Sequence, residues 1–425
     1  MNTEKHNRII HSSIKVWDIW IGCLLFIGFL NSSVLKPYLP SIGLVYYLMN
    51  GISFFLLFRF PLRIPVLIHI MICVLSILNG KPPSIFQPWS RLLFYIFGLG
   101  LYGVLFNNSM HNYVTHLLWN LLLYLSPLLS LVSFATVFFP QSIFHLENGA
   151  LMGLFNQPMM CAPNSCVAIL LMLYLLLKSK STKIKAWAIV NIITSISVVS
   201  FTGSRIAALA LIVSISFFIA IQIISLGLFK KLFFIFLIGV PISYLLVYLY
   251  NNTEMFSLLK NKMELYDSRG QILNTRAVLW DNRLREFKSQ PLLGIGFSSV
   301  DIITDTHYDG DHIEPGSSYL FSMSSTGLLG FISICCIIFY PFFNLLLSHN
   351  ISIDRCLHIA LLLFFYIHMS AEGYIFGAGN FLFIVFWIVI SHSYLICAID
   401  DHKLLSNTVS HEQQPDNPSL ATPNP

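Results

Sequence analysis

One charged side chain, Arg205, stands in the otherwise uncharged stretch from Ala186 to Phe229. It ends the turn "FTGSR", in which Gly203 permits a tight chain reversal and Ser204 can cap the following helix. A guanidinium beside a helix N-terminus is well suited to phosphate, because the helix dipole and its fork of N–H donors both favour an anion. The alternative is an arginine that extends to a membrane interface and binds no ligand.

A second set of residues has the spacing of one helix face. The segment "NTRAVLWDNRLREFKS" predicts a helix from Thr275 to Lys288. On it, Arg276 and Trp280 lie one turn apart and Arg283 lies a turn further, so one face carries two arginines beside an indole. Proteins hold phosphates and sugars with such groups, although surface helices also show this composition by chance.

Acidic and histidine side chains crowd the segment "THYDGDHIEPGSSYL", residues 306–320. Glu314 or His312 could accept a proton from a hydroxyl group. A metal ion is a further possibility for this cluster, but the spacing matches neither a calcium loop nor a pair of histidines on one helix face. We therefore expect no metal site and no cofactor.

Two other segments carry notable residues. Glu372, in "HMSAEGYIFGAG", lies between two apolar runs, and an ionisable group at a membrane is by default a functional hypothesis. The alternative is a salt bridge to a neighbouring arginine that only orders the bundle. The segment "PLLGIGF", residues 291–297, has a Gly-x-Gly spacing without a third glycine, so we expect a chain-reversing turn rather than a dinucleotide site.

The elements that position these residues are predicted to be membrane helices. The chain has 425 residues, of which 56% are hydrophobic and 10% charged, with a mean hydropathy of +0.73. Soluble domains carry about 25% charged residues, so the composition predicts an integral membrane protein. We expect an all-α fold with about 12 transmembrane helices. The approximate spans are 16–35, 38–58, 63–79, 91–108, 113–137, 159–177, 186–202, 205–228, 232–250, 317–347, 356–371 and 374–397.

The distribution of basic residues predicts the orientation. With a cytoplasmic N-terminus, the inside segments carry thirteen lysines and arginines and the short outside loops carry four. The expected organisation is a cytoplasmic N-terminus (1–15), helices 1–9 (16–250), a large outside loop (251–316), helices 10–12 (317–403) and a disordered cytoplasmic tail (404–425). We expect a multi-pass membrane protein with both termini inside.

Four elements, taken in order, resemble the O-antigen ligase and polymerase superfamily, including the Wzy-type polymerases. They are the "TGSR" turn, the Arg-x₃-Trp pair in a large outside loop, "PLLGIGF", and the "SSYL…STGLLG" segment that opens the next helix. The resemblance covers roughly residues 186–345. Weaker support comes from "AEGYIFGAGN", residues 371–380, which is similar to the end of bacterial exopolysaccharide polymerases.

The resemblance implies a membrane glycosyltransferase that acts on glycans carried by undecaprenyl pyrophosphate. It also implies a bacterial inner membrane as the location, with residues 251–316 as a large periplasmic loop. The implied product is a surface polysaccharide, such as an O-antigen, capsule or exopolysaccharide. In this interpretation Arg205 and Arg276 bind the pyrophosphate, with Arg283 as a further phosphate ligand, and Glu314 or His312 accepts the proton of the acceptor hydroxyl. The implied partners are the lipid-linked oligosaccharide, the bilayer and a chain-length regulator. No nucleic-acid partner is expected, because the net charge of +5 is spread along the chain.

Two alternatives to a polymerase remain open in the sequence. The first is an O-antigen ligase that transfers glycan to lipid A core. Such ligases commonly have a histidine where this chain has Gly316, which favours the polymerase. The second is a transporter or flippase of the lipid-linked unit, but transporters usually place charges near the bilayer midplane, and here they gather in an outside loop.

Overall fold

The computed structural model describes residues 2–57, 61–139, 142–146, 149–224, 274–302, 313–348 and 352–412. Within these ranges the fold is all-helical, with isolated bridges and no strand. The long helices are α1 (Asn2–Leu30), α2 (Ile42–Leu57), α3 (Ile64–Gly80), α4 (Pro88–Leu101), α5 (Ser109–Ala135), α6 (Pro158–Lys178), α7 (Thr182–Thr202), α8 (Arg205–Ile224), α11 (Asn274–Ser289), α12 (Ser318–Leu347), α13 (Ile353–His368) and α14 (Phe381–Glu412). Short 3₁₀ turns are η1 (Lys36–Tyr38), η2 (Ser84–Phe86) and η3 (Thr136–Phe138).

The chain is a multi-pass membrane protein. Among the described residues, six helices are long and apolar enough to cross a bilayer, and α1, α2 and α3 contribute shorter apolar stretches. The six candidate spans are Ser109–Phe138, Pro158–Lys178, Thr182–Thr202, Arg205–Gln222, Ser318–Leu347 and Phe381–Ala398. The predicted total of about 12 spans therefore stays a prediction. The expected span 232–250 lies outside the described residues.

The last helices depart from the predicted boundaries. The run predicted from residue 374 becomes helical only at Phe381, because the glycine-rich stretch "AEGYIFGAGN" forms a loop between α13 and α14. Helix α14 then continues to Glu412, past residue 404, where the tail is expected to begin. Neither glycine nor proline occurs between Phe381 and Glu412, so no strong helix breaker ends the helix earlier.

Three helices form the centre of the bundle. Every residue from Phe381 to Ile390 of α14 is buried, as is every residue from Cys161 to Met172 of α6 and from Arg355 to Leu362 of α13. A helix that is buried and apolar all round belongs to the interior. By contrast, α3 exposes one stripe at helical spacing, made of Ile64, Ile68, Met71, Leu75 and Leu78. Such a stripe is suited to contact lipid tails.

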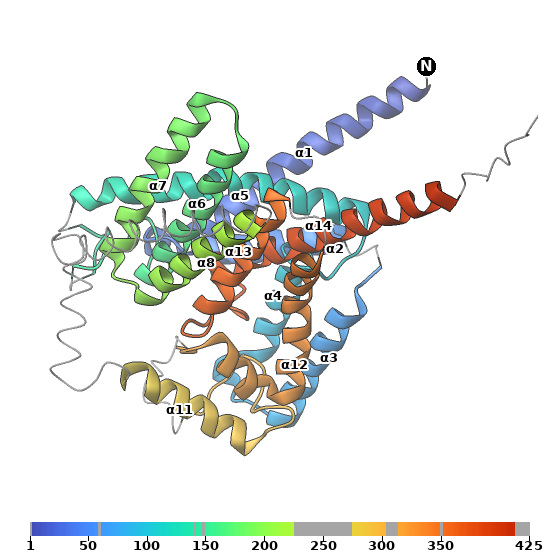
Figure 1. Cartoon of the computed structure of the whole chain (residues 1–425). Helices are drawn as coiled ribbons and strands as arrows, with labels where there is room; N and C mark the ends of the chain where they lie inside the picture. The colour runs from blue at the N-terminus through green and yellow to red at the C-terminus, as the bar shows by residue number, and fades with distance from the viewer. Residues whose placement is uncertain are drawn as a thin grey trace, which may run out of the picture.

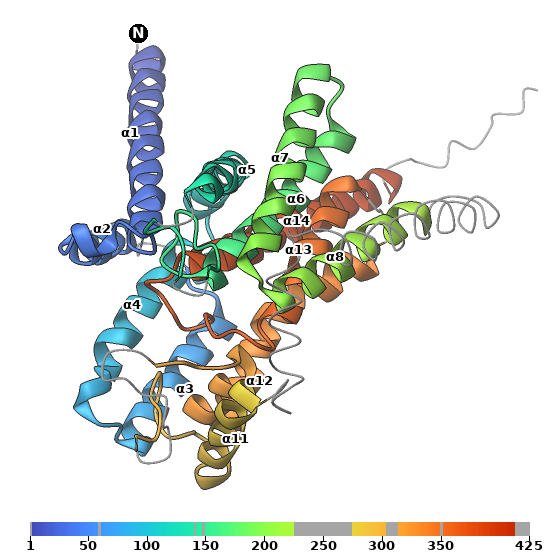
Figure 2. The same ribbon diagram turned by 90° about the vertical axis from the view of Figure 1, so that its left-hand side faces the viewer.

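One end of the molecule is built by two pairs of helices, α3 with α4 and α11 with α12, and the two pairs are distant in sequence. Figures 1 and 2 both place α11 beside α12, with α3 and α4 at the same end. The packing contacts agree, since α12 packs on both α3 and α11. The predicted helix from Thr275 to Lys288 is confirmed by α11, which is one residue longer at each end. Three of the motif segments, in residues 274–302 and 313–348, therefore lie at this end of the molecule.

Helix α12 is interrupted at Gly327, about one third of the way along its length. Gly327 has φ 66° and ψ −170°, so the helix axis is interrupted there. The "PLLGIGF" segment fills the break with its own backbone: Ile295 N and Gly296 N donate to the carbonyls of Ser324 and Ser325 at 2.9 and 3.2 Å. Beyond the break, Leu328 N donates to Pro291 O at 2.8 Å.

The fit between this segment and the broken helix requires glycine. A Cβ on Gly327 would lie 2.3 Å from the carbonyl carbon of Leu292, and one on Gly294 would lie 2.5 Å from that of Ser325. Gly294 and Gly296 also adopt φ of 71° and 123°. The prediction of a glycine-bearing turn is confirmed. The structure adds that this turn supplies partners to backbone groups that the broken helix cannot satisfy itself.

Candidate functional site

The site is centred on Arg276, in the first turn of α11. Its Nη2 donates to the Glu372 carboxylate, which lies in the loop between α13 and α14, and its Nη1 donates to the carbonyl of Gly316 at 3.2 Å. The indole Nε1 of Trp280 donates to the same carbonyl at 3.1 Å. The predicted pairing of Arg276 and Trp280 on one helix face is therefore confirmed, with a main-chain oxygen as their common acceptor.

The loop that carries Glu372 is fixed to the start of α12. Ser318 N donates to the carbonyls of Met369 and Glu372 at 2.9 and 3.0 Å, and Ser318 Oγ donates to Glu372 O at 2.8 Å. In return, Tyr374 N donates to Ser318 Oγ at 3.1 Å. One buried serine of the "GSSYL" segment thus holds the "AEGY" segment by its backbone, which sets the position of the carboxylate.

A close main-chain approach supports the same junction. Gly373 packs against Pro315, and a Cβ on it would lie 2.1 Å from the proline Cβ. Gly316 has φ 72°, and a Cβ there would lie 2.9 Å from Leu279 Cβ of α11. Because Gly316 needs the left-handed conformation, a histidine at this position would be strained. The glycine that distinguishes this chain from the ligase pattern is therefore a structural requirement of the junction.

Aromatic packing joins the two glycine-rich segments, "PLLGIGF" and "AEGYIFGAGN". Phe297, the last residue of "PLLGIGF", is fully buried, and its ring centroid lies 5.0 Å from that of Phe376 of "AEGYIFGAGN". Tyr95 of α4 completes the cluster, with centroids 5.4 Å from both rings. Three motif segments of the resemblance, together with the "AEGYIFGAGN" stretch, therefore converge at one place in the structure.

The electrostatics of the junction differ from those of a surface ion pair. The side chains of Arg276 and Glu372 are 27% and 16% exposed. Burial raises the pKa of the Glu372 carboxyl to about 7, Arg276 opposes this shift, and the negative charge of Glu314 adds to it. Glu314 is exposed two residues before Gly316, so the site combines one arginine with two carboxyl groups.

Arg283 has a different environment from Arg276. Its guanidinium is fully buried, donates from Nη1 to both carboxylate oxygens of Glu286 at 2.7 Å, and lies 5.9 Å from the ring centroid of Phe321. Glu286 also accepts from the backbone N–H of Asp301 at 2.8 Å. The ion pair of Arg283 and Glu286 thus lies on the side of α11 that contacts α12. The role of Arg283 as a phosphate ligand stays a prediction, and the structure shows it bound to an internal carboxylate.

Arg205 occupies the turn that the sequence predicts. Helix α7 ends at Thr202, Gly203 adopts φ 63°, and Arg205 is the exposed first residue of α8. The Ser204 hydroxyl donates to the sulfur of Met159 at 3.8 Å. Helix α8 packs mainly against α13 and α6, whereas Arg276 belongs to α11. The structure therefore confirms the turn, and a joint action of Arg205 and Arg276 stays a prediction.

The remaining candidates lie partly outside the described residues. This applies to His312 and to the neighbouring His307, Asp309 and Asp311. Among the residues that the structure describes, no group of three histidine, cysteine or acidic side chains could hold a metal ion. The sequence analysis did not identify the Gly316 carbonyl or Ser318 as parts of the site. Their segments are marked by "GSSYL", but a backbone acceptor leaves no signal in residue type.

The fold and the convergence of these segments define a multi-pass helical membrane protein with a polar junction at one end of its bundle. Residues 189–335 match the family model described as O-antigen ligase. The match confirms the resemblance to the O-antigen ligase and polymerase superfamily over this part of the chain, which includes "TGSR", Arg276, Trp280 and "PLLGIGF". No curated protein matches the chain.

Proposed function

We propose that the protein polymerises oligosaccharide repeat units, carried on undecaprenyl pyrophosphate, into a surface polysaccharide at the periplasmic face of the inner membrane. The observation that carries this proposal is the junction of Arg276, Glu372 and the Gly316 carbonyl. It joins segments that the superfamily resemblance singles out, and its charged groups are partly accessible. An arginine held in this way is preorganised to receive an anion.

The proposed reaction is a substitution at the anomeric carbon of the donor. The hydroxyl oxygen of the acceptor sugar forms a new bond to this carbon. At the same time the bond between the anomeric carbon and the pyrophosphate oxygen breaks. The pyrophosphate leaves with the electron pair, and the guanidinium of Arg276, assisted by Arg205, stabilises its charge. Glu314, or His312 in its place, takes the proton of the acceptor hydroxyl.

Glu372 has a supporting part in this mechanism. Its carboxylate competes with the substrate for Arg276 and keeps the guanidinium oriented while the site is empty. Protonation of Glu372 releases Arg276 to the pyrophosphate. Burial of the carboxyl group, and to a smaller extent the negative charge of Glu314, favours that protonation, as the raised pKa of Glu372 indicates.

The ligase remains the second candidate, because the matching family model carries that description. The conformation of Gly316 favours the polymerase. A histidine at this position would be strained, because its backbone would need a φ of 72° and its Cβ would approach Leu279 too closely. A transporter is less well supported, since the polar junction lies among loops and helix ends rather than along a path through the bundle.

The length of the surface glycan tests the proposal. A strain without this chain should display single repeat units where the complemented strain displays long polymer. Complementation with Arg276→Ala should resemble the deletion while the protein inserts in normal amount. Full-length polymer that accumulates on the lipid carrier would establish the ligase, and repeat units retained on the cytoplasmic face would establish a transporter.

A further inference from the structure

A pocket of mixed polarity lies at the opposite end of α11 from Arg276, and half of its lining residues are polar. It has a volume of about 590 Å³, within the range of small-molecule sites. One wall is the turn after α3, Gly80 to Pro83, and the other is formed by the end of α11 and the segment 299–302. Arg276 and Gln290 are fourteen positions apart along this helix and its end, or about 21 Å at the helical rise of 1.5 Å per residue.

The lining of this pocket combines hydrogen-bond donors and acceptors of both signs. Arg285 and the amide of Gln290 can donate and the carboxylate of Asp301 can accept, whereas the buried Glu286 carboxylate and Ser299 hydroxyl already bond to Arg283 and to the Gly296 carbonyl. A phosphate would meet the carboxylate of Asp301 here, and a cation would meet Arg285. A neutral ligand with many hydroxyl groups can use both kinds of partner without uncompensated charge.

The walls of the pocket are held in place before a ligand arrives. Asn79 Nδ2 donates to Gln290 Oε1 at 3.1 Å, which joins α3 to the end of α11. Glu286 is 3% exposed and is fixed by Arg283 and by the backbone N–H of Asp301. A Cβ on Gly80 would lie 2.3 Å from the Ile295 carbonyl, so the walls meet backbone to backbone. Such preorganisation lowers the entropy cost of binding.

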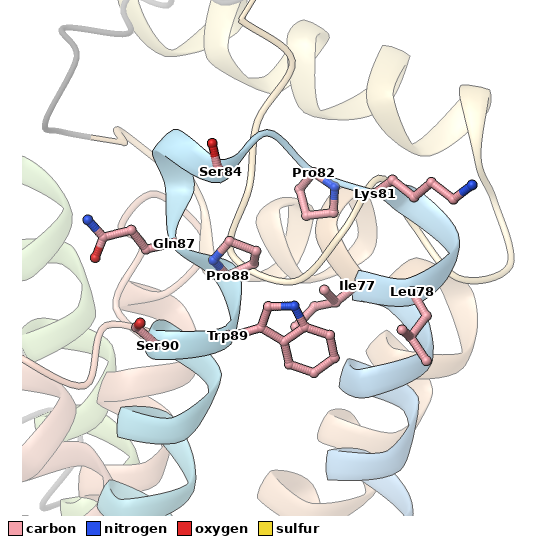
Figure 3. Close-up of a pocket in the computed structure, with 9 residues that line it drawn as sticks. All are labelled: Ile77, Leu78, Lys81, Pro82, Ser84, Gln87, Pro88, Trp89 and Ser90. Atoms are coloured by element: carbon pink, nitrogen blue, oxygen red, sulfur yellow. The ribbon is translucent and has the colours of Figure 1, made fainter.

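A second pocket on the other side of Pro82 provides a contrast. Figure 3 shows it between α3 and α4, where the indole of Trp89 lies alongside Ile77 and Leu78 while the Lys81 side chain points away. Its volume is about 550 Å³, and its floor is apolar. Trp89 and Leu78 are 52% and 56% exposed. This surface, with its exposed indole, suits a lipid chain, whereas the pocket beside Gln290 has charged residues of both signs and no aromatic residue in its lining.

We propose that the pocket beside Gln290 and Asp301 binds sugar residues of the glycan substrate remote from the bond that is made. This inference rests on the proposed function for the class of ligand. The pocket and Arg276 share one rigid helix, so a bound glycan would have its reacting end at the junction and later sugars at the pocket. The pocket would then contribute to selection among repeat units.

Binding of a carrier-free oligosaccharide tests this inference. The full chain in lipid nanodiscs is titrated calorimetrically with the repeat-unit oligosaccharide released from its carrier. Gln290→Ala and Asp301→Ala should each raise the Kd at least about fivefold, the effect of one lost hydrogen bond. Lys288→Ala, an exposed change on the same helix, is the matched control and should leave Kd unchanged. Unfolding temperatures verify that each variant is folded.

The outcomes separate this inference from the proposed function. Unchanged binding in folded Gln290→Ala and Asp301→Ala proteins would overturn the inference even if the protein polymerises glycan. Loss of binding in Trp89→Ala alone would also overturn it and assign the ligand to the apolar pocket. Binding that depends on Gln290 and Asp301 would support it even if no polymer forms, in which case only the proposed function fails.

Discussion

Arg276 and Glu372 form an ion pair although 96 positions separate them in the chain. The pair connects helix α11 to the loop between the last two helices, α13 and α14. It leaves both side chains partly exposed, at 27% and 16%. The arginine is therefore available to a second anion, which distinguishes it from Arg283 on the same helix.

The first prediction separates catalysis from folding at this pair. Arg276→Ala should lower glycan transfer about 100-fold or more, the effect of removing one preorganised charge stabiliser. It should also lower the free energy of unfolding by about 1–3 kcal/mol, because Glu372 loses its partner. The double variant Arg276→Ala/Glu372→Gln should recover most of the stability and none of the activity. Activity in the double variant would remove Arg276 from the mechanism.

The second prediction concerns pH. Burial raises the pKa of Glu372 to about 7 from an ordinary value of 4.5, so the folded state binds this proton more tightly than the unfolded state. The associated stability is complete below pH 4.5 and is lost as the pH rises through 7. Unfolding temperatures of the wild type should therefore fall over this window relative to Glu372→Gln.

The same titration should appear in the kinetics. Above pH 7 the ionised Glu372 competes for Arg276, so the KM for the lipid-linked donor should rise through this pH in the wild type. In Glu372→Gln the rise should be absent. A KM profile with the same inflection in both proteins would assign the titration to another group.

The third prediction concerns the break in α12. Gly327→Ala should destabilise the protein by more than about 1–3 kcal/mol, since strain at positive φ adds to a clash with the Leu292 carbonyl. Gly22→Ala is the matched control, because a Cβ on this helical glycine of α1 meets nothing within 4 Å. It should be neutral or stabilise by up to about 1 kcal/mol. Thermal unfolding in one detergent compares the two, and equal stability would contradict the tight fit at the break.

The fourth prediction concerns the buried pair of Arg283 and Glu286. Arg283→Met should cost about 3–5 kcal/mol, because it leaves the buried Glu286 without its charge partner. The double variant Arg283→Met/Glu286→Leu should cost less than the sum of its single changes. The exposed pair of Arg285 and Asp281 is the control, and its removal should cost less than about 1 kcal/mol. If Arg283→Met unfolds normally but loses activity, the phosphate role of Arg283 gains support instead.

Local features of this protein are predictable because they depend on neighbouring residues. The turn at Gly203, the helix around Arg276 and the reversal at Gly294 all follow from spacing and glycine chemistry, and the structure confirms them. The boundary of α14 is less predictable. Apolar residues such as Tyr374 and Phe376 extend the hydropathy signal into a segment that folds as a loop.

The sequence allows a salt bridge between Glu372 and a neighbouring arginine, but the arginine involved and the other relationships between distant segments could not be predicted. Nothing in the spacing of Arg276 and Arg283 indicates that one binds Glu372 and the other Glu286, because the direction of a side chain depends on how α11 packs on α12. The common acceptor at Gly316 is a backbone oxygen, which every residue type possesses. The filling of the α12 break by residues 291–296 likewise requires two backbones to be placed together.

The break in α12 limits which segments of this protein can be replaced by segments of similar proteins in a chimera. Residues 291–296 and 324–329 complete each other's backbone hydrogen bonds, and their glycines exclude any side chain between them. A chimera that takes only the loop or only the helix from another protein that matches the same family model joins two surfaces that are not shaped for one another. These two segments should therefore be exchanged together, and chimeric proteins should have their crossover points before residue 290 or after residue 330.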